Sequence, residues 1–418
     1  MNSNYDVLII GGGPAGASTA TILAEHGRRV LVIEREKFPR YHVGESLLPF
    51  TFGPLERLGM IPKMRKSRFI KKYSVSFVQP DGRPSQPFYF HTRYDKETIA
   101  QTWQVLRSEF DEMLLNNARE RGAEVREETT VIQLLKDDSG RVIGVEVKNK
   151  DGSVEPLHAK FVIDASGKEA FASSRQGWRV GDPFLNKVAV WTYYKGSKRS
   201  TDLDEGETTI AFVPDKGWFW HIPQHDDMVS VGIVAEGKYL ARDGVRDPET
   251  MFQREIGQNL WIKDRLSTGE CTGKYWLTSE YSRHSKYCAS PGLLLVGDAF
   301  AFLDPVFSSG VMLALKSGVL AGDAVHEALA ANDLAPERFA DYAGQIREGV
   351  ENMRKLVYAF YDPSFSFKDV VMKYPEAAAE LTDCLSGDLN KDYTPLWNRI
   401  REFADLPDDL PYGVPLAA

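Results

Sequence analysis

The chain has 418 residues, of which 43% are hydrophobic and 26% are charged. This composition is typical of a globular protein with two or three structural units, and it excludes a fibrous or disordered chain. Lys and Arg number 51 against 59 for Asp and Glu, and the resulting net charge of −8 argues against a nucleic-acid-binding protein. No run approaches the ~18 consecutive apolar residues of a membrane span.

The cysteines and histidines give no sign of a disulfide framework or a metal site. Cys271, Cys288 and Cys384 are odd in number and widely spaced, which favours a reducing compartment. His221 and His225 have no carboxylate or cysteine at a suitable spacing. The N-terminus leads directly into a strand-like run, without room for a signal peptide. We therefore expect a cytoplasmic protein without a metal.

The first part of the chain contains the most informative pattern. The run Tyr5 to Ile10 is β-branched and aromatic, which is typical of a strand buried on both faces. A glycine-rich turn over residues 11–16 (GGGPAG) follows, then a helix to Leu23 and a second strand over residues 29–34. The order of strand, G-x-G-x-x-G turn, helix, strand and acidic residue is that of a dinucleotide-binding unit.

Each residue type in this unit has a physical reason. Gly11 permits the tight turn, Gly13 lets the backbone approach a pyrophosphate, and Gly16 lets the helix pack closely on the strand. The start of the helix offers N–H groups and a partial positive charge to phosphates. Glu34 can accept hydrogen bonds from ribose hydroxyls. The sequence therefore predicts a dinucleotide site made of Gly11, Gly13, Pro14, Ala15, Gly16, Glu34 and Arg35.

The rest of the chain alternates short strands with helical stretches. Strands are predicted over residues 145–148, 161–164 and 292–297, and alternating runs at 209–213 and 229–234 indicate an antiparallel sheet. Residues 311–330 have helical spacing. The last 70 or so residues also read as helices, interrupted at Pro363 and Pro375.

Three further segments resemble those of FAD-dependent monooxygenases. Val105-Leu106-Arg107, followed by Phe110-Asp111, resembles their arginine helix. Asp164-Ala165-Ser166-Gly167 resembles the turn behind the ribityl chain, and Gly297-Asp298-Ala299 resembles the segment whose aspartate meets a ribityl hydroxyl. Together with the glycine turn they occur in the expected order, so the resemblance implies that the cofactor is FAD.

Three motifs narrow the resemblance to flavin-dependent halogenases. Residues 217–223 (GWFWHIP) contain W-x-W-x-I-P, the signature of these enzymes. Residues 302–310 (FLDPVFSSG) are similar to the segment that lines flavin and halide. Residues 43–49 (VGESLLP) are close to the version in phenol- and pyrrole-type halogenases. The resemblance extends from residue 5 to about residue 330.

The resemblance implies an α/β protein of two domains with a para-hydroxybenzoate-hydroxylase-like fold. We expect a FAD-binding Rossmann-type domain at residues 1–72, 98–175 and 280–345. An antiparallel-sheet substrate domain is expected at 73–97 and 176–279, and a C-terminal helical segment at 346–418. The further cofactor residues that the resemblance implies are Glu45, Ser46, Arg107, Asp164, Gly167, Asp298, Pro305, Gly310 and Val311.

The resemblance also implies an activity. FAD, reduced by a separate flavin reductase, reacts with oxygen, and chloride or bromide held by the backbone of Ser309 and Gly310 is oxidised to hypohalous acid. Lys72, five residues before Phe77 on the expected first strand of the substrate sheet, directs this acid to an electron-rich phenolic or pyrrolic ring. The substrate is either free or attached to a carrier protein. The basic run over residues 63–72 is either a solvated face or a docking site for an acidic carrier.

A physical argument accompanies the two tryptophans and the lysine. Trp218 and Trp220, with Pro223, would form a bulky apolar wall that keeps the substrate away from the flavin, whereas a hydroxylase holds its substrate next to the flavin. Plain core packing is the other explanation for two aromatic residues on one face of a strand. The ammonium of Lys72, with an ordinary pKa of about 10.4, is expected to be protonated at pH 7 and able to polarise hypohalous acid.

Three other functions fit the same motifs. A geranylgeranyl-reductase-like flavoprotein carries a similar aromatic segment and would reduce isoprenoid double bonds. An aromatic hydroxylase would be reduced directly by NAD(P)H. A catalytically silent flavoprotein would act as a binding module. Direct reduction by NAD(P)H separates the hydroxylase from the halogenase.

Overall fold

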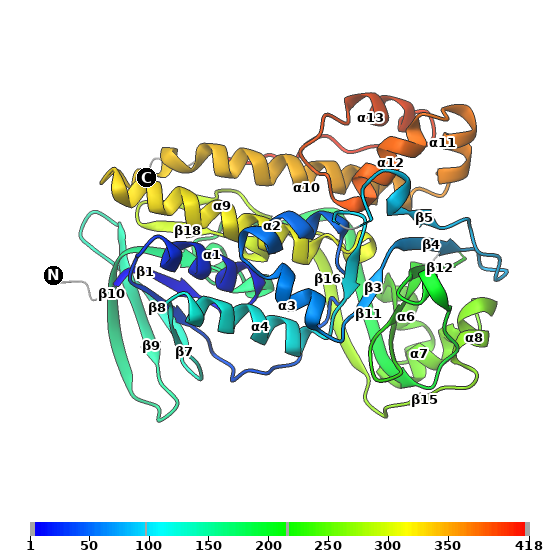
Figure 1. Ribbon diagram of the computed structural model, residues 1–418, viewed down its shortest axis with the longest axis horizontal. Helices are drawn as coiled ribbons and strands as arrows, with labels where there is room; N and C mark the ends of the chain where they lie inside the picture. The colour runs from blue at the N-terminus through cyan, green and yellow to red at the C-terminus, as the bar shows by residue number, and fades with distance from the viewer. Residues whose placement is uncertain (1–4, 97, 215–216, 414–418) are drawn as a thin grey trace.

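The computed structural model describes residues 5–96, 98–214 and 217–413, which form two large sheets joined by helices (Figure 1). The first sheet has eight strands: β1 (Tyr5–Ile10), β2 (Val30–Ile33), β7 (Glu124–Arg126), β8 (Thr130–Lys136), β9 (Val142–Lys148), β10 (Val154–Asp164), β17 (Ala289–Ser290) and β18 (Leu293–Leu295). Its path runs β17-β18-β10-β1-β2-β7, and β18, β10, β1, β2 and β7 pair in parallel. The predicted first strand is confirmed, and the strand predicted at 292–297 is shorter, because the chain turns at Gly297.

The second sheet has nine strands: β4 (Ser74–Val78), β5 (Phe88–Tyr89), β11 (Arg179–Lys195), β12 (Thr208–Val213), β13 (Gly217–Pro223), β14 (Met228–Glu236), β15 (Glu270–Cys271), β16 (Trp276–Ser285) and β19 (Ala301–Phe302). Its pairs are antiparallel as predicted, except that β4 and β12 run parallel. Alternate residues face opposite sides. Val190 and Phe219 pack in one apolar cluster, whereas Trp191 and Trp220 face the first sheet's side of the molecule.

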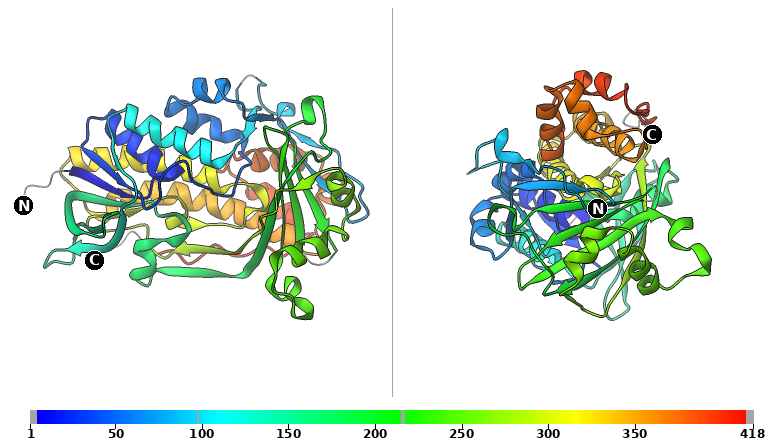
Figure 2. Two further views of the ribbon diagram at one scale, coloured as in Figure 1. Left: turned by 90° about the horizontal axis from the view of Figure 1, so that it is seen from below. Right: turned by 90° about the vertical axis from the view of Figure 1, so that its right-hand side faces the viewer.

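Thirteen α-helices lie in the described ranges of the chain. They are α1 (Pro14–Glu25), α2 (Phe52–Arg57), α3 (Ile61–Lys66), α4 (Arg107–Glu120), α5 (Phe171–Arg175), α6 (Gly237–Leu240), α7 (Pro248–Ile256), α8 (Leu260–Leu266), α9 (Gly310–Ala330), α10 (Ala340–Tyr361), α11 (Phe367–Lys373), α12 (Ala377–Ser386) and α13 (Thr394–Ile400). Among these helices, none is long and apolar enough to cross a membrane. Seen from below, the two sheets lie toward opposite ends of the molecule (Figure 2). Helices α9 and α10 run along the side of the first sheet toward the second (Figure 1).

Small residues bring α1, the first sheet and α9 into close contact. A side chain at Gly16 would place its Cβ atom 2.0 Å from the carbonyl oxygen of Gly11. One at Gly318 would place it 2.6 Å from the carbonyl oxygen of Ala15. The predicted role of Gly16 in close packing therefore fits the structure, and Gly318 lets α9 pack closely on α1 for the same reason.

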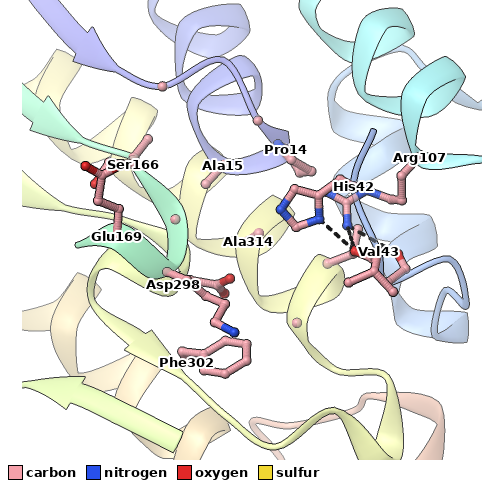
Figure 3. Close-up of a pocket in the computed structure, with 18 of the residues that line it drawn as sticks. Pro14, Ala15, His42, Val43, Arg107, Ser166, Glu169, Asp298, Phe302 and Ala314 are labelled. Carbon is pink, nitrogen blue, oxygen red and sulfur yellow. Dashed lines mark hydrogen bonds between the residues drawn. The ribbon is translucent and has the colours of Figure 1, made fainter. Parts of the chain in front are cut away.

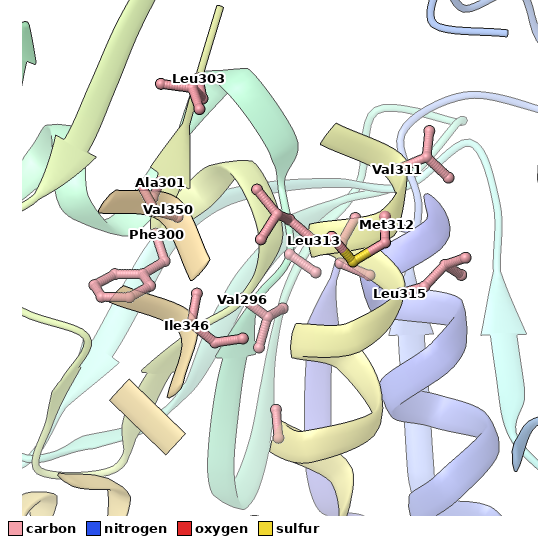
Figure 4. Packing of buried hydrophobic residues seen from close by; sticks show 14 of the residues in the cluster. Val296, Phe300, Ala301, Leu303, Val311, Met312, Leu313, Leu315, Ile346 and Val350 are labelled. Carbon is pink, nitrogen blue, oxygen red and sulfur yellow. The ribbon is translucent and has the colours of Figure 1, made fainter. Parts of the chain in front are cut away.

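The C-terminal helices are joined to the core of the first sheet. Figure 4 shows Ile346 and Val350 of α10 beside Val296 and Phe300. Helices α10 and α11 end at Tyr361 and Lys373, ahead of Pro363 and Pro375 as predicted. The proposed domain boundaries at 279/280 and 345/346 fall inside β16 and α10, and the domain division stays a prediction.

Lys72 does not share a strand with Phe77, so that prediction is wrong. Lys72 is the last residue of β3 (Ile70–Lys72), which pairs with β6 (Thr102–Gln104) in a separate two-stranded sheet. Phe77 belongs to β4, which pairs with β12. The alternation within β3 is as expected, because Lys71 is exposed and Lys72 is buried.

Candidate active site

A cavity of about 390 Å³ lies between the two sheets, at the carboxyl ends of β1 and β2. Figure 3 shows Pro14 of α1, Arg107 of α4, Asp298 of the 3-10 turn Gly297–Ala299 and Ala314 of α9 around it. This volume is within the range of cofactor and ligand pockets. The predicted site residues that line it are Gly11, Gly13, Pro14, Ala15, Glu34, Arg35, Glu45, Ser46, Arg107, Gly167, Trp218, Trp220, Asp298, Pro305, Gly310 and Val311.

The start of α1 fits a phosphate group. Gly13, which has no side chain to cap the helix, occupies the N-cap position in an extended conformation. A Cβ atom at Gly13 would meet only Arg40 Nη2, at 3.4 Å, so the glycine leaves room on the cavity side rather than relieving a backbone clash. Glu34 accepts hydrogen bonds from the N–H groups of Gly12 and Glu36, both at 2.8 Å, and its carboxylate lines the cavity. These residues fit a dinucleotide such as FAD.

Arg107 shapes the Val43–Ser46 segment from α4. Its guanidinium donates to the carbonyl oxygens of Val43 at 2.8 Å and Gly44 at 3.3 Å. It also pairs with Asp111 through two hydrogen bonds of 2.8 and 2.9 Å. Burial raises the pKa of Asp111, but the Arg107 guanidinium outweighs it and holds that pKa below its ordinary value. The arginine therefore fixes the backbone that presents Glu45 and Ser46.

Asp164 does not reach the cavity, contrary to the expectation of a cofactor contact. Its carboxylate accepts hydrogen bonds from the N–H groups of Ser166 at 3.0 Å and Ala172 at 2.7 Å. It is fully buried and holds the turn on which Gly167 lines the cavity. Gly16, like Asp164, does not line the cavity. Asp298, in contrast, lies on the cavity wall (Figure 3).

Trp218 and Trp220 form part of the wall on the side of the nine-stranded sheet. Their rings are 6.1 Å apart and both are almost fully buried. Trp218 Nε1 donates to Tyr361 Oη at 2.8 Å, and Tyr361 donates to Asp304 at 3.0 Å. The neighbouring Ile222 lines the cavity, whereas Pro223 does not. The end of α10 therefore holds the indole wall against the turn that begins α9.

The turn before α9 presents backbone rather than side chains. Pro305, Ser308 and Gly310 line the cavity, and Ser308 has a left-handed conformation with φ of 57°. Ser309 occupies the N-cap position, is 1% exposed and makes no side-chain cap bond. Its side chain does not line the cavity, so any contact with an anion there would come from main-chain N–H groups.

Lys72 lies one side chain behind the cavity wall. Its Nζ atom donates to Ser46 Oγ at 2.8 Å and to the Leu47 carbonyl oxygen at 3.2 Å. Ser46 Oγ in turn is 2.8 Å from Thr208 Oγ1, and both residues line the cavity. Burial lowers the pKa of Lys72 to about 7. Burial therefore favours the neutral amine more than the sequence analysis assumed, because the sequence does not reveal how completely the side chain is enclosed.

Several lining residues escaped the sequence analysis. Tyr41 and His42 follow the second strand in an irregular segment that carries no periodic signal. The charge of the Arg107 guanidinium lowers the pKa of His42 to about 4. Trp191 and Thr208 belong to the sheet, and Trp191 could have been found from the alternation in β11. Within the described residues, no cluster of side chains could hold a metal ion.

The fold and the cavity define a FAD-binding protein. The family described as "FAD binding domain" matches residues 4–333. A solved structure of the flavin-dependent brominase Bmp2 is 29% identical, with a TM-score of 0.85, and the match covers 96% of this chain and 97% of that one. A 1H-pyrrole-2-carbonyl-[peptidyl-carrier protein] chlorinase of Pseudomonas fluorescens is 31% identical, covering 92% of this chain and 90% of the relative. The corresponding brominase of Pseudoalteromonas luteoviolacea is 34% identical, covering 92% of each.

The chain therefore belongs to the flavin-dependent halogenases and is a FAD-dependent enzyme. This confirms the predicted family, fold class and cofactor. The reductase-like and hydroxylase-like alternatives are not favoured. The roles of individual site residues stay predictions.

Proposed function

We propose that this enzyme oxidises chloride or bromide and transfers it to a pyrrolic or phenolic ring that a carrier protein presents. The observation that carries the proposal is that Trp218, Trp220 and Ser46 line one cavity and that Lys72 lies behind Ser46. A hydroxylase must bring its substrate to the flavin itself, whereas two indoles in the wall keep a ring at a distance. FAD, reduced by a separate flavin reductase, supplies the oxidising chemistry when bound by activating oxygen.

The halide site is proposed at the first turn of α9. This helix has 21 residues, so its first N–H groups and its dipole favour an anion. The backbone N–H groups of Ser309 and Gly310 would hold the ion, with the left-handed backbone at Ser308 turning the chain into the helix. Because the side chain of Ser309 is buried, replacing it by alanine should leave halide binding largely intact.

Lys72 is proposed to position hypohalous acid through Ser46. Two of the three N–H groups of its ammonium are used by Ser46 and Leu47. A pKa of about 7 lets the side chain hold or release a proton near neutral pH: the ammonium form donates a hydrogen bond that can polarise the acid, and the neutral amine can accept a proton. Ser46 and Thr208 are the hydroxyl groups through which this amine meets the cavity.

The substrate class rests on the relatives. Both act, by their names, on a pyrrole carbonyl group attached to a peptidyl carrier protein. The sequence suggested that the basic run at residues 63–72 docks an acidic carrier. The structure gives this less support, because two of the basic side chains already pair with acidic residues of the chain itself. Lys63 pairs with Glu120, and Arg68 pairs with Glu109 and Asp226. Lys66 and Lys71 remain exposed cations on that face.

The test is a reconstituted reaction. The purified enzyme is mixed with FAD, a flavin reductase, NADH, and chloride or bromide, and is offered pyrrolyl-carrier protein, free phenols, free pyrroles or an isoprenoid. Mass spectrometry should find a carbon–halogen bond on a pyrrole or phenol that requires both the halide and the reductase. Reduction of the isoprenoid with no halogenated ring in any reaction would overturn the proposal.

A further inference from the structure

A chain of hydroxyl groups connects an open part of the cavity wall with a buried carboxylate. Tyr193 donates from Oη to Glu45 Oε1 at 2.6 Å, and Tyr41 Oη lies 3.1 Å from Tyr193 Oη. Trp191 Nε1 donates to Tyr41 Oη at 2.6 Å. Tyr41 is 44% exposed and Glu45 is 1% exposed, yet both line the cavity. Tyr193 lies behind the wall and connects the two.

When Glu45 is ionised it can only accept, and this sets the directions of the hydrogen bonds. A phenol has a single hydrogen to donate, and Tyr193 gives it to the carboxylate, so Tyr41 is then the donor to Tyr193. Tyr41 in turn accepts from Trp191. Every donor therefore points along the chain toward Glu45, the arrangement that a transfer of protons in that direction requires.

The aromatic surroundings hold the chain in place. Trp276 stacks on the ring of Tyr41 with centroids 4.8 Å apart and meets the ring of Tyr193 edge-on at 5.4 Å. On the other side of the carboxylate, Ser230 donates to Glu45 Oε2 at 3.4 Å and receives the N–H of Trp220 at 3.1 Å. Glu45 is thus held by hydrogen bonds from Tyr193 of β11 and Ser230 of β14.

The groups that face Glu45 leave it able to take up a proton. They are Tyr193 from β11, Ser230 from β14, the N–H groups of Gly44 and of Glu45 itself, and Arg107 from α4, which also interacts with Asp298. Burial raises the pKa of Glu45, while Tyr193, Arg107 and the backbone N–H groups lower it in part. The net direction is upward, toward the neutral carboxyl.

We propose that Tyr41, Tyr193 and Glu45 form a proton relay that runs behind the cavity wall from solvent to the interior of the site. As the O–H bond of Tyr193 breaks, an O–H bond forms on Glu45. The proton of Tyr41 replaces the one that Tyr193 lost, and water at the exposed side of Tyr41 restores its own. One proton passes from solvent to the carboxylate, and no electrons move.

The relay would serve the reaction inferred above, and to that extent it rests on the proposed function. The conversion of oxygen, a halide ion and anionic reduced FAD to hypohalous acid, water and FAD consumes protons. A cofactor that fills the cavity would block the direct path for water. The relay offers a second path that begins at Tyr41, which is 44% exposed, and ends at Glu45, which lines the cavity and can deliver the proton to an oxygen atom of the bound reactants.

The test follows the proton on Glu45 without turnover, in the enzyme with oxidised FAD and with neither halide nor substrate. Infrared spectroscopy records the carbonyl stretch of the protonated carboxyl group, and Glu45→Gln identifies the band. After mixing into D₂O, the rate at which the band shifts measures proton exchange. Tyr193→Phe should slow this rate by roughly 10²-fold, the lower end of what a positioned proton-transfer group contributes.

Tyr194→Phe is the matched control. Tyr194 is the next residue on β11, is equally buried, and faces the opposite side of the sheet, where it accepts from Gln253. This variant should exchange at the wild-type rate, and Tyr41→Phe, whose change lies on the exposed wall, should be slow. Wild-type exchange in folded Tyr193→Phe or Tyr41→Phe, or the lack of any band that depends on Glu45, would overturn the relay. Because no halogenation is measured, an enzyme that makes no halogenated product would contradict the proposed function alone.

Discussion

Replacing Lys72 by methionine should stabilise the protein while removing its function. The side chain is 2% exposed, and burial lowers the pKa of its amine from 10.5 to about 7. A shift of that size corresponds to about 5 kcal/mol of unfavourable free energy for the charged form in the folded state at pH 6. Methionine has a similar length and carries no charge. Losing the hydrogen bonds to Ser46 and Leu47 costs about 2 kcal/mol of the roughly 5 kcal/mol gained by removing the charge. Lys72→Met should therefore be more stable than the wild type by about 3 kcal/mol at pH 6.

The same argument predicts a dependence on pH. Between pH 7 and 10.5 the unfolded chain binds one more proton at this lysine than the folded protein does, so wild-type stability rises by about 1.4 kcal/mol per pH unit. Lys72→Met lacks this gain. Its advantage should therefore shrink by about 3 kcal/mol between pH 6 and pH 9, close to zero.

Denaturant unfolding at pH 6 and pH 9, with FAD at one saturating concentration, measures the difference directly. Lys71→Met is the control, because Lys71 is exposed and its replacement should change stability by no more than about 0.5 kcal/mol. A Lys72→Met protein that is less stable than wild type at pH 6, or whose advantage is the same at both pH values, would refute the argument that the ammonium is held in an apolar site.

The remaining predictions concern the cofactor, the wall and the substrate. Gly13→Val should fold but bind no FAD, as judged by flavin absorbance of the purified protein, whereas Gly16→Val should fail to fold, because its Cβ would lie 2.0 Å from the carbonyl oxygen of Gly11. Trp218→Phe removes the hydrogen bond to Tyr361, so its free energy of unfolding in denaturant should fall by about 1 kcal/mol while the protein still binds FAD. An unchanged unfolding midpoint would show that this hydrogen bond contributes nothing to stability. Stopped-flow mixing with NADH should not reduce the bound flavin at catalytic rates without a reductase. Competition assays should show a pyrrolyl or phenolic substrate preferred over free tryptophan, and regioselective halogenation of tryptophan at comparable rates would contradict this.

The sequence predicted best what depends on neighbouring residues. The turn at Gly11 and Gly13 and the acid at Glu34 lie where expected, because a strand, a tight turn and a helix start are local structures. The two tryptophans of the signature also line the cavity together, since alternate residues on a strand share a face.

The predictions failed where orientation depends on distant partners. Asp164 lies beside residues that line the cavity, but its side chain is buried and accepts hydrogen bonds from the turn behind the wall. Lys72 pairs with β6 instead of continuing into β4, a choice between partners that the lysine's own neighbours do not encode. The contact of Tyr193 with Glu45 joins residues 148 positions apart, and only the folded sheet brings them together.

The order of the strands in the first sheet bears on when the enzyme can acquire its cofactor during synthesis. Ile10 of β1 pairs with Asp164 of β10, and Asp164 pairs with Leu295 of β18. The centre of the sheet can therefore form only after segments far along the chain have been synthesised. Ribosomes add ~5–20 residues per second, which separates the first of these strands from the last by roughly 15–60 s. The part of the wall at Asp298 and Gly310 emerges later still. FAD capture is therefore a late event, and a nascent chain stalled before residue 295 would expose strand edges that a chaperone must cover.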